Sequence, residues 1–516
     1  MLAGLPACRK VSHQLTGGSQ YSRSARTQLP GVKMLATLHL PAFCFLNHFL
    51  LANFVYAATA IPNLSYISPP CPTFLGPPDI YRVLVLQGMD VPGTNSVNGA
   101  VFNILNSIIG SGIIGLPYAL SNAGMATGLA MLVTVGLVSQ FAIYTLVLTG
   151  RRVGAMHYSE VARITLGKFG SQALSLSVIV SLAGVVTTYL VILGDIFSSL
   201  RLTYLPAQEW LTRSVAIAIV AYVFILPLLF FRHSGPMAKY SVVSVAALPV
   251  ILLIVAIRAP VYASTTTATD YPVVIGPHVF RALGVLSFSY CSAHAAFQNF
   301  LGLRERTMQN WRHATTIATW VAIALCCAFA AIGLASFGSG VQANIFLNFP
   351  TTDAYVNIAR VLFCLTLVLT FPLSFYPIRD TLTHLLCIHS EQRRVSGRSL
   401  ESLLTVSALT FICIVAANCT DLGVAYELVG AASATTISFI FPALIFLHGG
   451  TDVTLKGAIN FGLHSSTTTV LPLLGAGDST TSARWRCLVW QWLGGWFTLL
   501  FGMLVFVVGT FSTLQR

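Results

Sequence analysis

Apolar stretches of about twenty residues alternate with short polar segments along most of the chain, from residue 99 to residue 511. A helix needs about this length to cross the hydrocarbon core of a bilayer. The pattern therefore predicts an all-α polytopic membrane protein. We expect eleven transmembrane helices, at residues 99–120, 124–149, 172–200, 214–231, 238–257, 278–300, 314–337, 355–378, 401–418, 427–447 and 487–511.

The first predicted span contains residues that a plain membrane anchor would not need. Its middle carries Gly110, Ser111 and Gly112, and Gly115 and Pro117 follow. Glycine weakens a helix and proline interrupts it, and in hydrocarbon the freed backbone groups are tolerated where they line a polar cavity. A helix broken here presents N–H groups to an anion and carbonyl groups to a cation. We therefore expect Gly110, Ser111 and Gly112 to bind the carboxylate of a substrate.

A stripe of hydroxyl groups follows one face of the predicted span 355–378. Thr366, Thr370 and Ser374 recur every four residues, and hydroxyl oxygens suit a small hard cation. The alternative is that each hydroxyl group donates to the carbonyl four residues earlier and does nothing else. We predict a site for the coupling ion, a small cation, from these residues together with Asn103 and Asn106, which share the face of the glycine break.

The predicted span 278–300 is also rich in small and polar residues, which is typical of a second interrupted helix that faces the first. We expect Ser289 and Ser292 to line a substrate pocket, although small residues also serve plain helix packing. His294 is either a proton- or substrate-binding group or a hydrogen-bonded structural histidine. Tyr189, on another span, could close the pocket with its hydroxyl group; the alternative is an ordinary core aromatic.

Two carboxylates lie near the outer ends of predicted spans, Asp195 and Glu427. Carboxylates at such positions can remain hydrated, and a proton relay is the alternative interpretation. The spans 99–120, 278–300 and 355–378 contain no Asp or Glu, so a strongly cationic substrate would lack a counter-charge there. This favours small neutral amino acids.

The composition supports the membrane assignment. Apolar residues make up 55% of the chain and charged residues only 8%, which excludes an ordinary soluble protein. A net charge of +13 would suggest nucleic-acid binding in a soluble chain, but here the basic residues concentrate in alternate loops. We expect no nucleic-acid partner, a cytoplasmic N-terminus and an outer C-terminus. The eleven cysteines form no CxxC pair, and we interpret them as small apolar residues rather than metal ligands.

Residues 1–98 differ from the rest of the chain and predict a poorly ordered N-terminal arm. Residues 61–98 are rich in Pro, Gly and Ser, which is typical of a flexible segment. Residues 34–60 are apolar, but Pro41 and Asn47 make them a poor spanning helix. They indicate either a signal-like or interfacial segment or a product of where the reading frame was started.

Four stretches carry a recognisable pattern, at residues 101–119, 286–291, 369–380 and 427–443. These stretches resemble the amino acid/auxin permease family, and within it the sodium-coupled neutral amino acid transporters and the vacuolar amino acid transporters. The resemblance covers about residues 99–448 and does not extend to the first ninety or so residues. The loop between the spans 238–257 and 278–300 lacks cysteine, so the disulfide typical of some relatives is absent.

The resemblance implies a fold like the bacterial leucine transporter, with a 5+5 inverted repeat plus one extra helix. The repeats would be residues 99–258 and 278–448, and residues 487–511 would form the eleventh helix. It also implies that the broken first helix holds the carboxylate and amino group of the substrate. Asn106 and Thr370 would then lie near a sodium site.

Together these patterns predict a secondary active transporter that moves small neutral amino acids with Na⁺ or H⁺ by alternating access. The sequence has no Walker A, HExxH or strand-borne GxSxG motif, so we expect neither an enzyme nor a cofactor besides the coupling ion. We expect a monomer in contact with the lipid bilayer of the plasma membrane or of a vacuolar or lysosomal membrane. The alternative is an amino acid sensor that signals through its N-terminal arm.

Overall fold

The structure is a computed structural model, and it describes residues 93, 95–230, 234–263, 271–387, 397–449 and 479–515. Every described residue belongs to the unit Thr59–Arg516. The predicted apolar segment 34–60 and nearly all of the predicted arm 1–98 lie outside the described residues. Where the structure describes the chain, the regular elements are helices, beside one isolated bridge between Asn95 and Leu303. The all-α prediction is therefore confirmed.

The helices alternate with short turns in chain order, and four of the short elements (η2, η6, η7 and η8) are π-helical. The first part of the chain forms α3 (Val97–Ile108), η1 (Ser111–Gly115), α4 (Leu116–Ala123), α5 (Met125–Val153), α6 (Tyr158–Tyr204), α7 (Arg213–Ile219), η2 (Val220–Ile225), α8 (Leu226–Leu229) and α9 (Ser234–Ala263). The rest forms α10 (Val279–Ser289), η3 (Ala293–Ala295), α11 (Ala296–Leu301), α12 (Met308–Phe337), η4 (Gly338–Gly340), η5 (Ile345–Asn348), α13 (Ala354–Cys387), α14 (Gly397–Asn418), α15 (Leu422–Leu428), η6 (Val429–Ala434), η7 (Thr436–Ile440), α17 (Ser479–Leu504), η8 (Val505–Gly509) and α18 (Thr510–Leu514).

Among the described residues, 7 helices are long and apolar enough to cross a membrane, or 8 if the bent pair Val97–Ile108 and Ser111–Ala123 counts as one span. The helices Arg213–Leu229 and Ala246–Tyr262 are apolar but shorter, and α10 to α11 form an interrupted element. The chain is therefore a multi-pass membrane protein. The count of eleven and the inverted repeat remain predictions.

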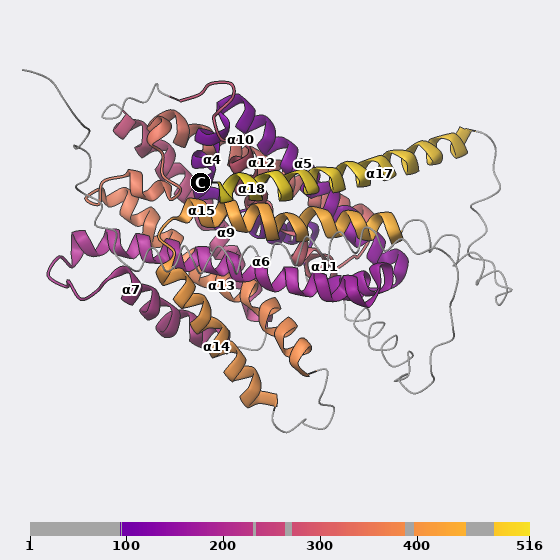
Figure 1. Cartoon of the computed structure of the whole chain (residues 1–516), viewed down its shortest axis with the longest axis horizontal. Coiled ribbons are helices and arrows are strands. Elements are labelled where there is room, and N and C mark those ends of the chain that lie inside the picture. The colour runs from indigo at the N-terminus through magenta and orange to yellow at the C-terminus, as the bar shows by residue number, and fades with distance from the viewer. Residues whose placement is uncertain are drawn as a thin grey trace, which may run out of the picture. The chain divides into compact units, whose positions relative to one another are not determined.

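Helix α6 contains two helical parts, one before and one after Gly167. Gly167 has φ 77°, a left-handed conformation that glycine adopts without a steric penalty, so the helical run changes direction there. The segment that begins at Tyr158 is thus distinct from the predicted span 172–200. In Figure 1, α6 and α17 run in roughly the same direction while α14 is inclined to them.

The interrupted elements lie in the interior of this unit. Helix α10 packs against α4, α15 and η6, while α12 packs against α3, α4 and α5. Large apolar side chains such as Leu253, Phe411 and Leu500 point outward, as expected for a surface in contact with lipid. This arrangement surrounds both interrupted elements with other helices.

Candidate substrate and ion site

The first predicted span is broken where its glycines stand. Helix α3 ends at Ile108, Ile109 and Gly110 leave helical geometry, and a 3₁₀ turn begins at Ser111. The two halves are bent by 47°. No described side chain caps the start of the second half. The predicted interruption is therefore confirmed, and it leaves backbone N–H groups at this point for another partner.

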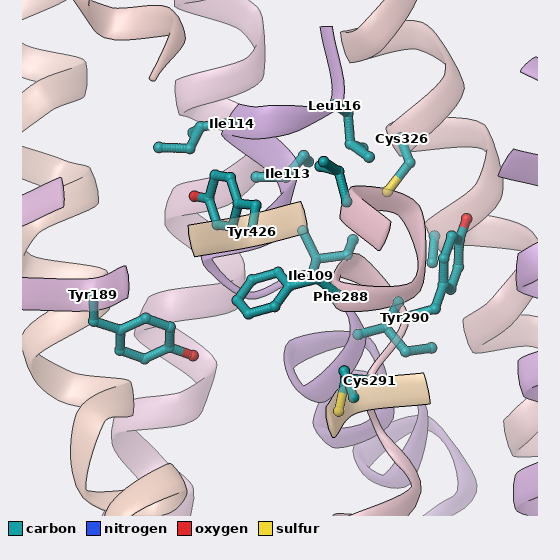
Figure 2. Close-up of a cluster of buried hydrophobic side chains, with 14 of the residues drawn as sticks. Ile109, Ile113, Ile114, Leu116, Tyr189, Phe288, Tyr290, Cys291, Cys326 and Tyr426 are labelled. Atoms are coloured by element: carbon teal, nitrogen blue, oxygen red, sulfur yellow. The ribbon is translucent and has the colours of Figure 1, made fainter. Parts of the chain in front are cut away.

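Two distant helices hold this break in place. The Tyr426 hydroxyl group donates to the Ser111 carbonyl oxygen at 2.8 Å, and the Ser111 and Thr188 hydroxyl oxygens are 3.3 Å apart. The Tyr426 ring also packs against Phe288, with ring centroids 4.9 Å apart (Figure 2). The sequence does not mark Tyr426 or Thr188 as site residues, because neither belongs to a repeating pattern of polar positions along its helix.

The predicted span 278–300 is interrupted as well. Helix α10 ends at Ser289, and helical turns resume only at Ala293. The consecutive residues Tyr290 and Cys291 point in different directions in Figure 2. Tyr290 is directed to the side where Cys326 of α12 lies. The expectation of a second interrupted helix is therefore confirmed.

The two breaks approach each other at backbone distance. A Cβ atom at Gly112 would lie 2.6 Å from Ser289 Oγ and 2.8 Å from Ser289 Cα, so a larger residue would collide there. A Cβ atom at Gly110 would lie 3.3 Å from the Tyr189 hydroxyl oxygen. Four of the six predicted substrate residues are thus close together, and Ser111 lies between two of them in the chain.

Tyr189 connects the first break to the hydroxyl stripe of α13. Its phenol group interacts with the hydroxyl groups of Ser374 and Thr370, and its ring meets the edge of Phe371 at 6.3 Å. The Thr370 hydroxyl group donates to the Thr366 carbonyl at 2.7 Å. This is the local bonding that the sequence offered as the alternative. A hydroxyl group that donates its hydrogen still has lone pairs for a cation.

The other predicted ion ligands, Asn103 and Asn106, lie on a different helix and are partly exposed. Their helix, α3, packs against α9 and α12, whereas α13 packs against α9 and α6. The predicted ion set is therefore divided between two helices that share α9 as a neighbour. The joint ion site stays a prediction.

Polar atoms without partners surround the second break. The hydroxyl groups of Ser181, Ser292 and Ser438 are buried and have no hydrogen-bond partner among the described residues, and the same is true of His294 Nδ1. The Cys291 thiol lies near the Ser181 and Ser438 hydroxyl groups, which come from α6 and η7. A buried polar atom left without a partner costs about 1–3 kcal/mol, so this region suits a polar guest. The sequence does not mark Ser181 or Ser438 as site residues, because single serines are common in apolar helices.

The two carboxylates Asp195 and Glu427 differ from each other. Asp195 pairs with Arg213 Nε at 2.7 Å and remains partly accessible. Glu427 is 0% exposed, and the Tyr118 hydroxyl group donates to its Oε1 at 2.8 Å. The expectation of a hydrated carboxylate is therefore wrong for Glu427. The physical reason is that α15 lies among other helices, with Gly284 of α10 close to the Glu427 backbone, so the side chain is covered.

Asp353, just before α13, connects the C-terminal end of α9 to that helix. It accepts from Arg258 Nε at 2.7 Å and from the Tyr262 hydroxyl group at 2.6 Å, and it caps α13 through the Val356 amide. Burial raises the pKa of Asp353, but the hydrogen bonds from Tyr262, Val356 and Arg258 outweigh burial and lower the pKa below its ordinary value. This carboxylate is therefore an ionised anchor at neutral pH.

A polytopic membrane protein with two interrupted helices in contact has the arrangement of a secondary transporter. Residues 93–450 match the sequence profile of the family described as transmembrane amino acid transporter protein. The chain belongs to this family, and the predicted family resemblance is confirmed.

Known proteins resemble the chain over most of its length. A Danio rerio protein provisionally named sodium-coupled neutral amino acid transporter 11 is 32% identical over 359 residues, which cover 69% of this chain and 79% of the relative. Vacuolar amino acid transporter 2 of Saccharomyces cerevisiae is 27% identical over 365 residues, which cover 67% and 75%. Among solved structures, a Na⁺-coupled sialic acid symporter in a substrate-bound outward-open state shares 12% identity and a TM-score of 0.49, over 85% of this chain and 96% of that one.

Proposed function

We propose that this chain is a secondary active transporter that moves small neutral amino acids with Na⁺ or H⁺ by alternating access. The observation that carries the proposal is the close approach of the two breaks, with Gly112 at backbone distance from Ser289. Membership of an amino acid transporter family supplies the class of cargo. We also propose the 5+5 inverted repeat plus one helix, because an interrupted helix begins each proposed repeat.

The substrate would bind between the breaks. In this proposal the backbone N–H groups of Gly110, Ser111 and Gly112 receive its carboxylate, because they begin the second half of a broken helix without a side-chain cap. Tyr189, with its hydroxyl group beside Gly110, and Ser289, beside Gly112, shape the pocket. Ser292 adds a buried hydroxyl group without a partner among the described residues, and the substrate can satisfy it.

The charge of the site favours neutral cargo. Residues 97–123 and 279–301, which form the two broken elements, contain no Asp or Glu, and their one basic residue, Arg281, donates its Nε to the Ser512 carbonyl oxygen. A cationic cargo side chain would therefore be desolvated without an opposite charge on these elements, which is costly. The coupling ion would meet the oxygens of Asn103, Asn106, Thr366, Thr370 and Ser374, and the name of the Danio rerio relative favours Na⁺.

Uptake by the purified full chain in liposomes tests the proposal. Labelled neutral amino acids would be offered with an inward Na⁺ gradient, with an inward H⁺ gradient and with neither. We expect accumulation above the equilibrium level with at least one gradient, and no accumulation in protein-free liposomes. If neither gradient drives uptake of any amino acid by folded protein, the transporter proposal is wrong.

The membrane and the orientation complete the proposal. The name of the Saccharomyces cerevisiae relative favours a vacuolar or lysosomal membrane over the plasma membrane, with the N-terminus on the cytoplasmic side. The sensor hypothesis depends on residues 1–98, nearly all of which lie outside the described residues, so it stays a prediction.

A further inference from the structure

Ser181 and Ser438 carry buried hydroxyl groups that the proposed substrate and ion sites do not use. Ser181 belongs to α6 and Ser438 to η7, within the candidate spans Tyr158–Tyr204 and Leu422–Gly449. The two serines are 0% and 1% exposed, and neither hydroxyl group has a hydrogen-bond partner among the described residues. A buried hydroxyl group in this state is costly, so both serines are candidates for contact with a ligand.

Other buried serines in the same two spans are satisfied locally. In α6 the Ser177 hydroxyl group donates to the carbonyl four residues earlier at 2.8 Å, and in η6 the Ser433 hydroxyl group does the same at 2.9 Å. Serine in a membrane helix commonly bonds in this way. Ser181 and Ser438 do not, so their hydroxyl groups remain for a partner outside their own helices.

Both hydroxyl groups lie at the second break. The Cys291 thiol is beside each of them, and the same thiol interacts with Tyr189, whose hydroxyl oxygen lies 3.3 Å from a Cβ atom placed at Gly110. Figure 2 shows the Tyr189 hydroxyl group directed toward the side on which Cys291 lies. Ser181, Cys291 and Ser438, which we call the serine cluster, therefore adjoin the proposed substrate site.

The serine cluster is within reach of cargo held at the first break. Cys291 follows Ser289 by two residues, so their Cα atoms are at most about 7 Å apart. Ser289 Cα in turn lies 2.8 Å from a Cβ atom placed at Gly112. A small amino acid whose carboxylate binds the N–H groups of the first break can therefore direct its side chain to the serine cluster.

The chemistry of the serine cluster suits an uncharged side chain that forms hydrogen bonds. A serine hydroxyl group both donates and accepts, and a thiol does so weakly. Residues 177–188, 290–295 and 436–440, which carry the cluster, contain no Asp, Glu, Lys or Arg. A hydroxyl group on the cargo can bond to these serines, whereas a methyl group in its place leaves them unpaired.

We infer that the serine cluster is a subsite for the side chain of the cargo, and that it favours small neutral amino acids that carry a hydroxyl group, such as serine. The inference depends on the proposed transport function and specifies its substrate. The geometry of η7, which carries Ser438, supports it, because π-helical turns within longer helices are frequent at functional sites.

The test compares serine with α-aminobutyrate, which has a methyl group in place of the hydroxyl group. Uptake of each by the purified full chain in liposomes gives kcat/KM under the gradient that drives transport. We expect the wild type to favour serine about tenfold, because α-aminobutyrate leaves the cluster unpaired. In Ser181→Ala and in Ser438→Ala this preference should fall toward equality, mainly through a higher KM for serine.

Two matched controls are available in the same spans. Ser177→Ala and Ser433→Ala each remove a buried hydroxyl group that already bonds within its own helix, so both should keep the wild-type preference for serine. The thermal midpoint of each purified variant shows whether it is folded. A loss of preference in the controls as large as that in Ser181→Ala and Ser438→Ala would overturn the inference.

The outcomes separate this inference from the proposed function. Equal kcat/KM for the two amino acids in the wild type overturns the inference, even if neither cluster variant folds, and leaves the transporter intact. An unchanged preference in folded Ser181→Ala and Ser438→Ala also overturns it, because the hydroxyl groups would then meet water only. Wild-type protein that accumulates no amino acid under any gradient contradicts the proposed function, and the inference is then wrong as well.

Discussion

The break in the first span and the break in the predicted span 278–300 differ in how their polar groups are satisfied. At the first break, Tyr426 holds the Ser111 carbonyl, and the Ser111 hydroxyl oxygen lies 3.3 Å from that of Thr188. Around the second, the hydroxyl groups of Ser181, Ser292 and Ser438 are buried without partners among the described residues. A polar group that already has a hydrogen-bond partner holds the backbone in one position. A buried polar group without a partner is stabilised when a ligand or water hydrogen-bonds to it. We therefore predict that the Ser111 carbonyl and hydroxyl groups form a rigid frame, that the uncapped N–H groups of the first break remain for cargo, and that the second break forms an adaptable wall.

The largest expected effect comes from closing the space between the two breaks. Gly112→Val places side-chain atoms where Ser289 already lies, so we expect a destabilisation of about 1–3 kcal/mol. Uptake should fall about tenfold or more, since about 1.4 kcal/mol of lost binding free energy is a factor of ten. Gly340→Val is the control, because nothing lies within 4 Å of a Cβ atom there. Normal uptake and thermal midpoint in Gly112→Val would mean that the breaks do not meet.

A moderate effect is expected from Tyr426→Phe, which tests the frame. The change leaves the buried Ser111 carbonyl without its donor, at a cost of about 1–3 kcal/mol. We expect a lower thermal midpoint and weaker substrate binding, measured by thermal unfolding and by the KM of uptake. Tyr355→Phe removes an exposed hydroxyl group and should change neither. An unaltered midpoint in Tyr426→Phe would contradict the role of this hydrogen bond.

The smallest effect on stability, with the opposite sign, is expected at the second break. Combined Ser181→Ala and Ser438→Ala removes two unpartnered hydroxyl groups, so the thermal midpoint should stay the same or rise. The KM of uptake should increase several-fold if these groups meet cargo or water. Ser177→Ala, on the same helix, is the control, because its hydroxyl group already donates to Ala173. A fall in the thermal midpoint as large as that of Tyr426→Phe would contradict the proposed difference between the two breaks, because the two serine hydroxyl groups would then contribute to stability.

Local chemistry explains why both breaks could be predicted. Gly110, Gly112 and Pro117 weaken a helix wherever it stands, so the interruption of the first span follows from the residues themselves. The hydroxyl stripe on α13 follows in the same way from the helical period. Its back-bonding from Thr370 to Thr366 was foreseen as the alternative, because it needs only the helix that carries it.

What the sequence determined by itself is the all-helical, multi-pass class of the protein, the places where two spans break, and the family to which the chain belongs. Only the tertiary structure decided that Tyr426 bonds to Ser111, 315 residues away, that Ser181 and Ser438 meet at Cys291, and that Glu427 is sealed from water. Backbone preference and hydropathy are properties of neighbours in the chain. Burial and hydrogen-bond partners depend on which distant helices pack together, and no local pattern of residues records that.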